Sequence, residues 1–363
     1  MIEQHYYTRE RRGVFSKTPG YDTVAKSEGL ENEFITNTLS NLCFYEAPAS
    51  LVGEENILKY PPALFYVDTE DNKMVIGQSA FAGKDYTGGR NRYFTHSYII
   101  PEEEKYKYIE NPEKIIYSAG FVRDYDIEKG TTIPEISEIK LSRDDDYFNS
   151  IEDMFSAANI DREIFADLIK ACFQSVKYHK KIYIVLDCEY SDMNSTAKGI
   201  LKYLYRALPF EVRRNLGFIT YMKEPKIKNL INIIFLGRGS IRRLSTEIKS
   251  GCVFDLSKGD FYLEDIDQKK HEFIDFVMNN IENTEKLKNF FYRADSVLLE
   301  DRLDIYKYDG LFKDSPHEKS EEKKCIDNEK SPQEISTEPL ADESKDSTIF
   351  RIIYKKILKF LKK

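Results

Sequence analysis

The sequence predicts a mixed protein of the α+β or mixed α/β class, with a strand-rich N-terminal domain followed by a domain that mixes helices and strands. Three observations lead to this prediction. Residues 1–142 contain short runs of strand-forming residues between turns, whereas residues 143–312 combine long amphipathic segments with apolar runs. The chain has 363 residues, which is enough for two domains of ordinary size.

The N-terminal elements follow from local patterns. Residues 63–67 and 73–76 are apolar runs on either side of a polar stretch, which is typical of a β-hairpin. Residues 94–100 predict a third strand that Pro101 ends. Residues 32–42 place apolar side chains at helical spacing and predict a helix.

The middle domain begins with a strongly amphipathic helix. Residues 161–178 carry this pattern, and Asp161 is suited to cap the first turn. Residues 181–186 form an almost continuous apolar run, which predicts a strand buried on both faces. The remaining patterns predict a helix at 196–208, strands at 217–222 and 230–236, and helices at 268–281 and 285–307.

The C-terminal part differs in composition. Residues 313–347 are rich in Glu, Lys, Ser, Asp and Pro without hydrophobic periodicity, which predicts a disordered linker. Residues 348–363 predict a basic amphipathic helix, whose partner is an anionic membrane surface, another protein or the chain itself. Its apolar face consists of Ile349, Phe350, Ile353, Tyr354, Ile357, Phe360 and Leu361, and its basic face of Arg351, Lys355, Lys356, Lys359, Lys362 and Lys363.

Composition limits the class of function. The net charge of −8 argues against a general nucleic-acid binder, so we expect no nucleic acid as a partner. The five cysteines and five histidines include no pair at metal-ligand spacing, so we expect no metal and no other cofactor. We expect a cytoplasmic protein, because the first residues lack a secretory signal and no apolar run reaches the length of a membrane-spanning helix.

Two blocks of sequence stand out, one within the first thirty residues and the other at residues 88–101. Both are dense in Gly, Arg, Tyr and His. Arg9, Arg11 and Arg12 either present a cationic surface to an acidic partner or protect an edge strand from aggregation. Arg90 and Arg92 in the second block are further binding candidates, because a guanidinium group pairs bidentately with carboxylate or phosphate.

The histidines of these blocks are the candidates for catalysis. His96 lies in a predicted strand near Arg90 and Arg92, and His5 lies in the opening strand, which could pair with it. Histidine is suited to general base chemistry near neutral pH, but it is equally suited to fix a loop through hydrogen bonds. The residue types therefore leave catalytic, binding and structural roles open.

Two further positions follow predicted strands. Asp187, Cys188 and Glu189 follow the strand at 181–186, where α/β proteins often place ligand-binding groups. Residues 237–239, Gly-Arg-Gly, follow the strand at 230–236 and either cradle an anion or form a tight turn. The chain has no phosphate-binding loop of the G-x-x-x-x-G-K-[ST] type, so we do not expect a GTPase of that class.

The two blocks together resemble the type 2 N-terminal domain of bacterial GTPase-associated proteins, over residues 1–142. The next region resembles the middle domain of the same family through residues 208–210, Arg213-Arg214 and residues 216–221. The resemblance implies a bacterial, multi-component system that works with GTPases in conflict or stress responses, and it supplies no catalytic residues. It favours a non-catalytic adaptor or regulator, tethered to membrane by its tail; the alternative is a hydrolase or transferase centred on His96.

Overall fold

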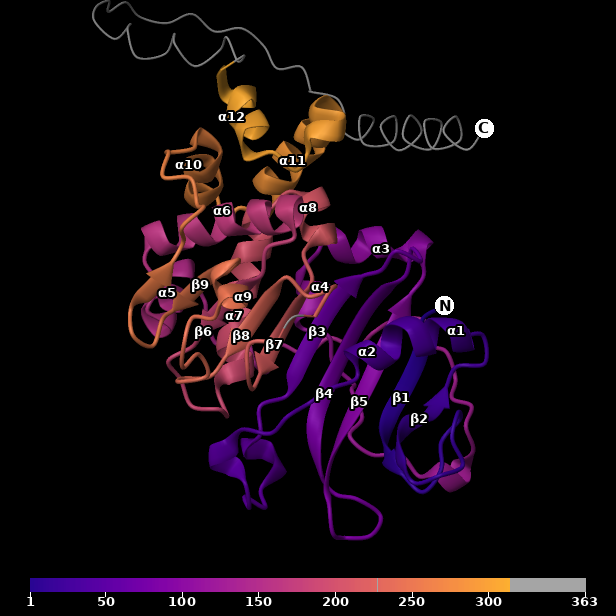
Figure 1. The fold of residues 1–363 in the computed structure, drawn as a ribbon. Helices are drawn as coiled ribbons and strands as arrows, with labels where there is room; N and C mark the ends of the chain where they lie inside the picture. The colour runs from indigo at the N-terminus through magenta and orange to yellow at the C-terminus, as the bar shows by residue number, and fades with distance from the viewer. Residues whose placement is uncertain (227, 314–363) are drawn as a thin grey trace, which may run out of the picture. The chain divides into compact units, whose positions relative to one another are not determined.

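The computed structural model describes residues 1–226 and 228–313, which lie in one compact unit. Within these residues the central element is a ten-stranded sheet with the order β10-β9-β6-β8-β7-β3-β4-β5-β1-β2 (Figure 1). Its strands are β1 (Glu3–Glu10), β2 (Gly20–Lys26), β3 (Ala63–Asp68), β4 (Met74–Lys84), β5 (Asn91–Ile100), β6 (Ile182–Val185), β7 (Phe218–Met222), β8 (Ile233–Leu236), β9 (Cys252–Asp255) and β10 (Asp260–Tyr262).

The N-terminal half of the sheet is antiparallel. The predicted hairpin is confirmed as β3 and β4, and the predicted third strand is confirmed as β5. β5 pairs with β4 on one side and with β1 on the other, and β2 completes the edge. Strands β1 and β5 are far apart in the sequence, so their pairing brings the two sequence blocks side by side.

The second half of the sheet is built from four parallel strands and the edge strand β10, which pairs antiparallel with β9. β6, β7, β8 and β9 run parallel, and all four residues of β6 are buried, as predicted for this strand. β3 pairs with β7 at Phe65 opposite Ile219 and so joins the two halves into one sheet. The boundary near residue 142 therefore stays a prediction about domains, while the sheet itself is continuous across both segments.

Helices cover both faces of the sheet. The helices are α1 (Asn32–Phe34), α2 (Ser40–Leu42), α3 (Glu102–Ile109), α4 (Glu113–Ile116), α5 (Ile151–Ala158), α6 (Arg162–Tyr178), α7 (Met193–Ala207), α8 (Phe210–Asn215), α9 (Thr246–Lys249), α10 (Glu272–Asn279), α11 (Thr284–Leu298) and α12 (Ile305–Lys313). The predicted class is confirmed, with a strand-rich N-terminal region and a middle region of helices and strands.

The two faces are distinguished by the side chains that meet each helix. Tyr66 of β3 contacts Tyr205 of α7, with 6.4 Å between ring centroids, and donates to the carbonyl of Arg214 at the end of α8. On the opposite face, Tyr93 of β5 donates to the carbonyl of Cys43, directly after α2. α7 and α8 thus cover one face, and the helical segment from α1 to α2 covers the other.

Two predicted helices match the structure in different degrees. The carboxylate of Asp161 accepts the backbone N–H of Ile164 at 2.8 Å, which confirms the predicted cap of α6. The helix expected at 285–307 is wrong as one element, because α11 ends at Leu298 and Leu299 has a φ of 45°. A new helix, α12, starts after Asp304, whose carboxylate accepts the N–H of Tyr306.

The last helices pack outside the first helical layer. α10 and α12 meet α6 around Phe173, whose ring centroid lies 5.8 Å from that of Phe273 and 5.7 Å from that of Tyr308 (Figure 1). Across residues 1–226 and 228–313, no helix has the length and apolar character needed to cross a membrane. Residues 314–347 of the predicted linker and the predicted basic helix lie outside the described residues, together with every tail residue named above, whereas Lys313 is the last residue of α12.

Candidate functional site

The two sequence blocks contain β1, β2 and β5, and their loops meet at one end of these antiparallel strands. Tyr6 lies opposite His96, and Thr8 lies opposite Phe94, in the pairing of β1 with β5. This register places the loop after β1, residues 11–19, at the same end of the sheet as the turn between β4 and β5, residues 85–90. We call these two loops together the hairpin end.

Two of the five candidate arginines, Arg9 of β1 and Arg92 of β5, lie in the strands next to the hairpin end and are held by ion pairs. Arg9 donates from Nε to a carboxylate oxygen of Asp85 at 3.1 Å. Arg92 lies 2.7 Å from Asp124 and 3.7 Å from Glu10. The side chains of Arg9 and Arg92 are 18% and 11% exposed, so their charges are largely committed to these partners.

Asp85 organises the turn that faces Arg9. One of its oxygens accepts the hydroxyl of Thr87 at 2.6 Å and the backbone N–H of Thr87 at 3.1 Å. The hydrogen bond from the Thr87 hydroxyl is the main cause that lowers the pKa of Asp85 to about 2, and Arg9 adds to this effect. The turn is therefore fixed to β1 by an ionised carboxylate.

The other three candidate arginines face solvent. Arg11 and Arg12 lie 3.3 and 3.1 Å from the two oxygens of Glu128, and their side chains are 57% and 55% exposed. Arg90 is also exposed, and its side chain forms no ion pair with any residue that the structure describes. Surface ion pairs of this kind contribute little free energy, so Arg11, Arg12 and Arg90 can engage a partner.

A stack of tyrosine rings lies next to Arg9. The ring centroids of Tyr21 and Tyr93 lie 4.4 Å apart, and those of Tyr7 and Tyr21 lie 6.1 Å apart. The guanidinium of Arg9 lies 5.9 Å from the Tyr21 ring centroid. The hydroxyl of Tyr21 accepts the backbone N–H of Tyr93, which holds the stack to β5. We call Tyr7, Tyr21 and Tyr93 the tyrosine stack.

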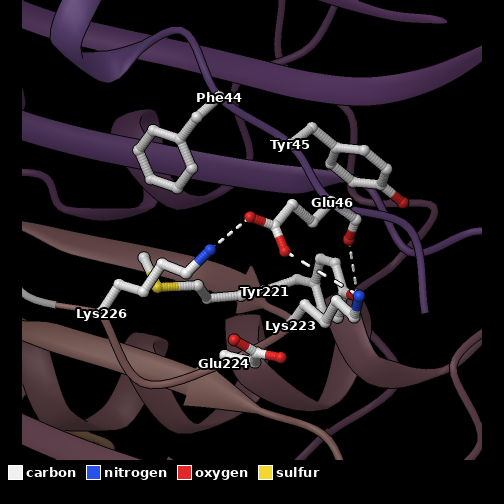
Figure 2. A pocket seen from close by; sticks show the side chains of 8 residues that line it. Phe44, Tyr45, Glu46, Tyr221, Lys223, Glu224 and Lys226 are labelled. Carbon is white, nitrogen blue, oxygen red and sulfur yellow. Dashed lines mark hydrogen bonds and ion pairs between the residues drawn. The ribbon is translucent and has the colours of Figure 1, made fainter. Parts of the chain in front are cut away.

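A small recess continues from the tyrosine stack towards the parallel strands. Figure 2 shows Phe44, Tyr45 and Glu46 facing Tyr221, at the end of β7, and the lysine-bearing turn that follows. The Tyr45 ring lies 6.4 Å from Tyr93 and 5.7 Å from Tyr221, between centroids. Glu46 pairs with both Lys223 and Lys226 of the turn, and its carbonyl accepts the Tyr221 hydroxyl.

His96 is enclosed on the other face of the sheet. Its Nδ1 accepts the backbone N–H of Val122 at 3.1 Å, so the proton lies on Nε2, which donates to Oε1 of Gln4 at 3.0 Å. Gln4 in turn donates to the carbonyl of Pro134. His96 is 1% exposed, and burial is the main cause that lowers its pKa to about 3. These contacts give the ring a structural role, because they tie β5 to β1 and to two later loops.

His5 is also buried, but it points to the opposite face from His96, because Tyr6 rather than His5 is its partner in the register. Its Nε2 contacts the Thr23 hydroxyl at 2.8 Å. Burial, with Lys26 as a second cause, lowers its pKa to about 3. The prediction that the opening strand pairs with the strand of His96 is confirmed, but the two rings do not form one site.

Several residues of this surface gave no signal in the sequence. The partners of the arginines, Asp85, Asp124 and Glu128, come from separate loops that only the fold brings together. Tyr45, which follows α2, and Tyr221 of β7 are likewise brought together only by the fold. Their only sequence signal is the high content of tyrosine, with 25 in the chain.

Comparison with known families agrees with the arrangement of these segments. Residues 1–139 match the model described as GTPase-associated protein 1, N-terminal domain type 2. Residues 154–258 match the model described as GTPase-associated protein 1, middle domain. No curated protein matches the chain. The two family matches follow each other in the expected order and together cover about two thirds of the sequence. The chain therefore belongs to the GTPase-associated protein 1 family.

Proposed function

We propose that this protein is a non-catalytic adaptor or regulator that binds a GTPase of a bacterial conflict or stress system. The family descriptions, which name association with a GTPase, support this proposal. The observations that carry it are the exposure of Arg11, Arg12 and Arg90 at the hairpin end and the tyrosine stack next to Arg9. The hairpin end and the tyrosine stack are the proposed contact surface.

The residue types at this surface are those that dominate protein interfaces. Tyrosine and arginine are enriched among the residues that contribute most of the binding free energy. The stack is anchored by hydrogen bonds to β5 and to Cys43, so a partner would not have to order it. Binding to a pre-organised surface costs less conformational entropy.

The charges define the partner surface that fits. Arg11 and Arg12 share one carboxylate, Glu128, so two guanidinium groups face a single acidic group. An acidic surface on the GTPase would supply further carboxylates, and each can accept two parallel hydrogen bonds from an arginine. Complementary charge of this kind accelerates association and sets orientation.

The contacts of His96 favour an adaptor over a hydrolase or transferase that uses this ring. Both ring nitrogens already have protein partners, and the side chain is buried. A general base must reach the proton that it removes and should have a pKa near the working pH. A ring with a pKa lowered to about 3 is poorly matched to that task.

The experiment is affinity capture from the native host with the full chain as bait, followed by identification of the bound proteins. We expect a GTPase to be recovered by the wild-type chain and lost with the triple variant R11E/R12E/R90E. The matched control is K269E/K270E/R293E, which reverses three exposed charges in the loop before α10 and on α11. Recovery of no GTPase, or equal loss with both variants, would refute the proposed surface.

We further propose that residues 348–363 tether the adaptor to anionic membrane. The support is the sequence alone, in which cationic residues alternate with apolar ones at helical spacing. Deletion of residues 348–363 should abolish sedimentation with vesicles that contain anionic lipid and leave GTPase capture unchanged. Equal sedimentation with and without these residues would contradict the tether and leave docking on another protein or on the chain itself as the alternatives.

A further inference from the structure

The parallel strands create a second feature, at their carboxyl ends. β6 is followed by α7, which leads to β7, whereas β8 is followed by α9, which leads to β9. In the sheet, β6 and β8 are neighbours, and β7 and β9 lie on opposite sides of this pair. The two connections therefore leave adjacent strands in opposite directions.

The connections also leave to opposite faces of the sheet. α7 lies on the face of Tyr66, as the contact between Tyr205 and Tyr66 shows. α9 lies on the other face, since burial and, as a second cause, the carboxylate of Glu247 raise the pKa of Tyr183 of β6 to about 12. Tyr183 shares its face with Ile219 and Phe65 through the register of the strands. Where the connections of neighbouring parallel strands go to opposite faces of the sheet, α/β proteins form a crevice that binds ligands.

The residues that begin the two connections contact each other at the carboxyl ends of β6 and β8. Asp187, after β6, pairs with Nη2 of Arg238, after β8. The ring of Tyr190 packs on Gly237, where an added Cβ would lie 2.7 Å from a ring carbon. The side chain of Arg238 nevertheless remains 67% exposed. The loop after β8 is thus held against the residues that follow β6, while the guanidinium of Arg238 reaches solvent.

Two more arginines extend the same loop. Ile241 is buried and anchors it, and Arg242 and Arg243 beside it are exposed. Neither forms an ion pair with a residue that the structure describes. The acidic groups on the two connections are Asp187, Glu189, Asp192, Glu211 and Glu247. Of these, Asp187 is the one that contacts an arginine of the loop.

We propose that Arg238, with Arg242 and Arg243, forms a binding site for a phosphate-bearing ligand at the carboxyl ends of β6 and β8. A guanidinium has five N–H donors in a planar fork, and Asp187 engages one of its nitrogens. The remaining donors match two phosphate oxygens. Asp187 acts as a positioning residue that fixes the orientation of Arg238, and the other two arginines supply positive charge.

The test is calorimetric titration of the full chain with pyrophosphate, with GDP in a second series to distinguish a nucleotide from free phosphate groups. We expect R238A and R238K each to weaken pyrophosphate binding about tenfold or more, because lysine keeps the charge but loses the fork. The control is K269A/K270A, which removes two exposed lysines from the loop before α10 and should leave binding unchanged. Thermal unfolding of each variant reports whether it is folded.

The variant D187N separates a positioned site from a simple patch of charge. Removal of a negative charge strengthens anion binding if only the net charge matters. If Asp187 orients Arg238, the same change weakens binding. Tighter binding by D187N, wild-type affinity in R238K or no binding of pyrophosphate by the wild-type chain would overturn the proposal. GTPase capture is measured on the same variants, so failure of this site is distinguishable from failure of the adaptor function.

Discussion

His96 donates from Nε2 to the side-chain oxygen of Gln4, 3.0 Å away, across the pairing of β5 with β1. The direction of this bond is fixed, because the other ring nitrogen accepts the N–H of Val122. The neutral ring thus connects two strands that are about 80 residues apart in the sequence. His96, which the sequence suggested as a catalytic candidate, thus holds the two sequence blocks together.

Replacement of His96 by alanine should destabilise the protein without a direct effect on the partner surface. The variant leaves buried polar groups of Gln4 and Val122 without a partner, which costs about 1–3 kcal/mol for each unsatisfied group. Denaturant unfolding of H96A measures the loss. The control is H179N at the exposed C-cap of α6, where φ is 56° and asparagine is tolerated. A wild-type free energy of unfolding for H96A would contradict the structural role.

The two buried histidines predict a loss of stability in mild acid. Their pKa values are about 3 in the folded state, against about 6.5 in an unfolded chain. The unfolded state therefore binds more protons between these values, and the free energy of unfolding decreases as pH falls from about 6.5 towards 3.

The variant H96Q isolates one histidine of this pair. From pH 7 to pH 5, each histidine should remove about 2 kcal/mol from the free energy of unfolding. The glutamine side chain does not titrate, so the difference between wild type and H96Q should shrink by about that amount at pH 5. Denaturant titrations at both pH values provide the comparison, and an equal difference at the two would show that His96 does not titrate as described.

Gly77 of β4 should not tolerate a side chain. It lies opposite Phe65 of β3, and an added Cβ would lie 2.2 Å from Cζ of that ring. G77A should therefore cost about 1–3 kcal/mol through overpacking. G20A in β2 is the matched control, since no atom lies within 4 Å of its added Cβ. Thermal unfolding that is the same for both variants would argue against this packing.

The last helices are joined by a buried polar contact. Nδ1 of His271, which precedes α10, lies 2.7 Å from Asp309 of α12, and the second oxygen of Asp309 accepts the N–H of Phe273. D309A leaves both groups unpaired, so it should cost more than about 2 kcal/mol. Hydrogen exchange should accelerate in α10 and α12 before it does in β6. Unchanged exchange in these helices would show that the contact does not hold them.

Local sequence patterns were sufficient to predict the elements that are determined by residues close together in the sequence. The hairpin of β3 and β4 and the cap of α6 at Asp161 are examples, because turn residues and capping residues act on their immediate neighbours. The break after Leu298 was missed, because the apolar spacing continues across it and does not reveal a positive φ.

The long-range arrangement required the structure. The pairing of Phe65 with Ile219 joins strands from separate parts of the chain, and no local pattern encodes such a register. The same holds for the candidate site. Residue type identified the five arginines as candidates. Only the fold shows that Arg9 and Arg92 are largely buried in ion pairs, whereas the other three are exposed.

The central claim is that the hairpin end binds a GTPase, and the affinity between the two purified proteins tests it most directly. The GTPase recovered by capture is titrated with wild type, R11E/R12E/R90E and K269E/K270E/R293E at one ionic strength. We predict a loss of at least about tenfold for the hairpin-end variant and wild-type affinity for the control. Wild-type affinity in R11E/R12E/R90E, with the fold intact, would contradict the account.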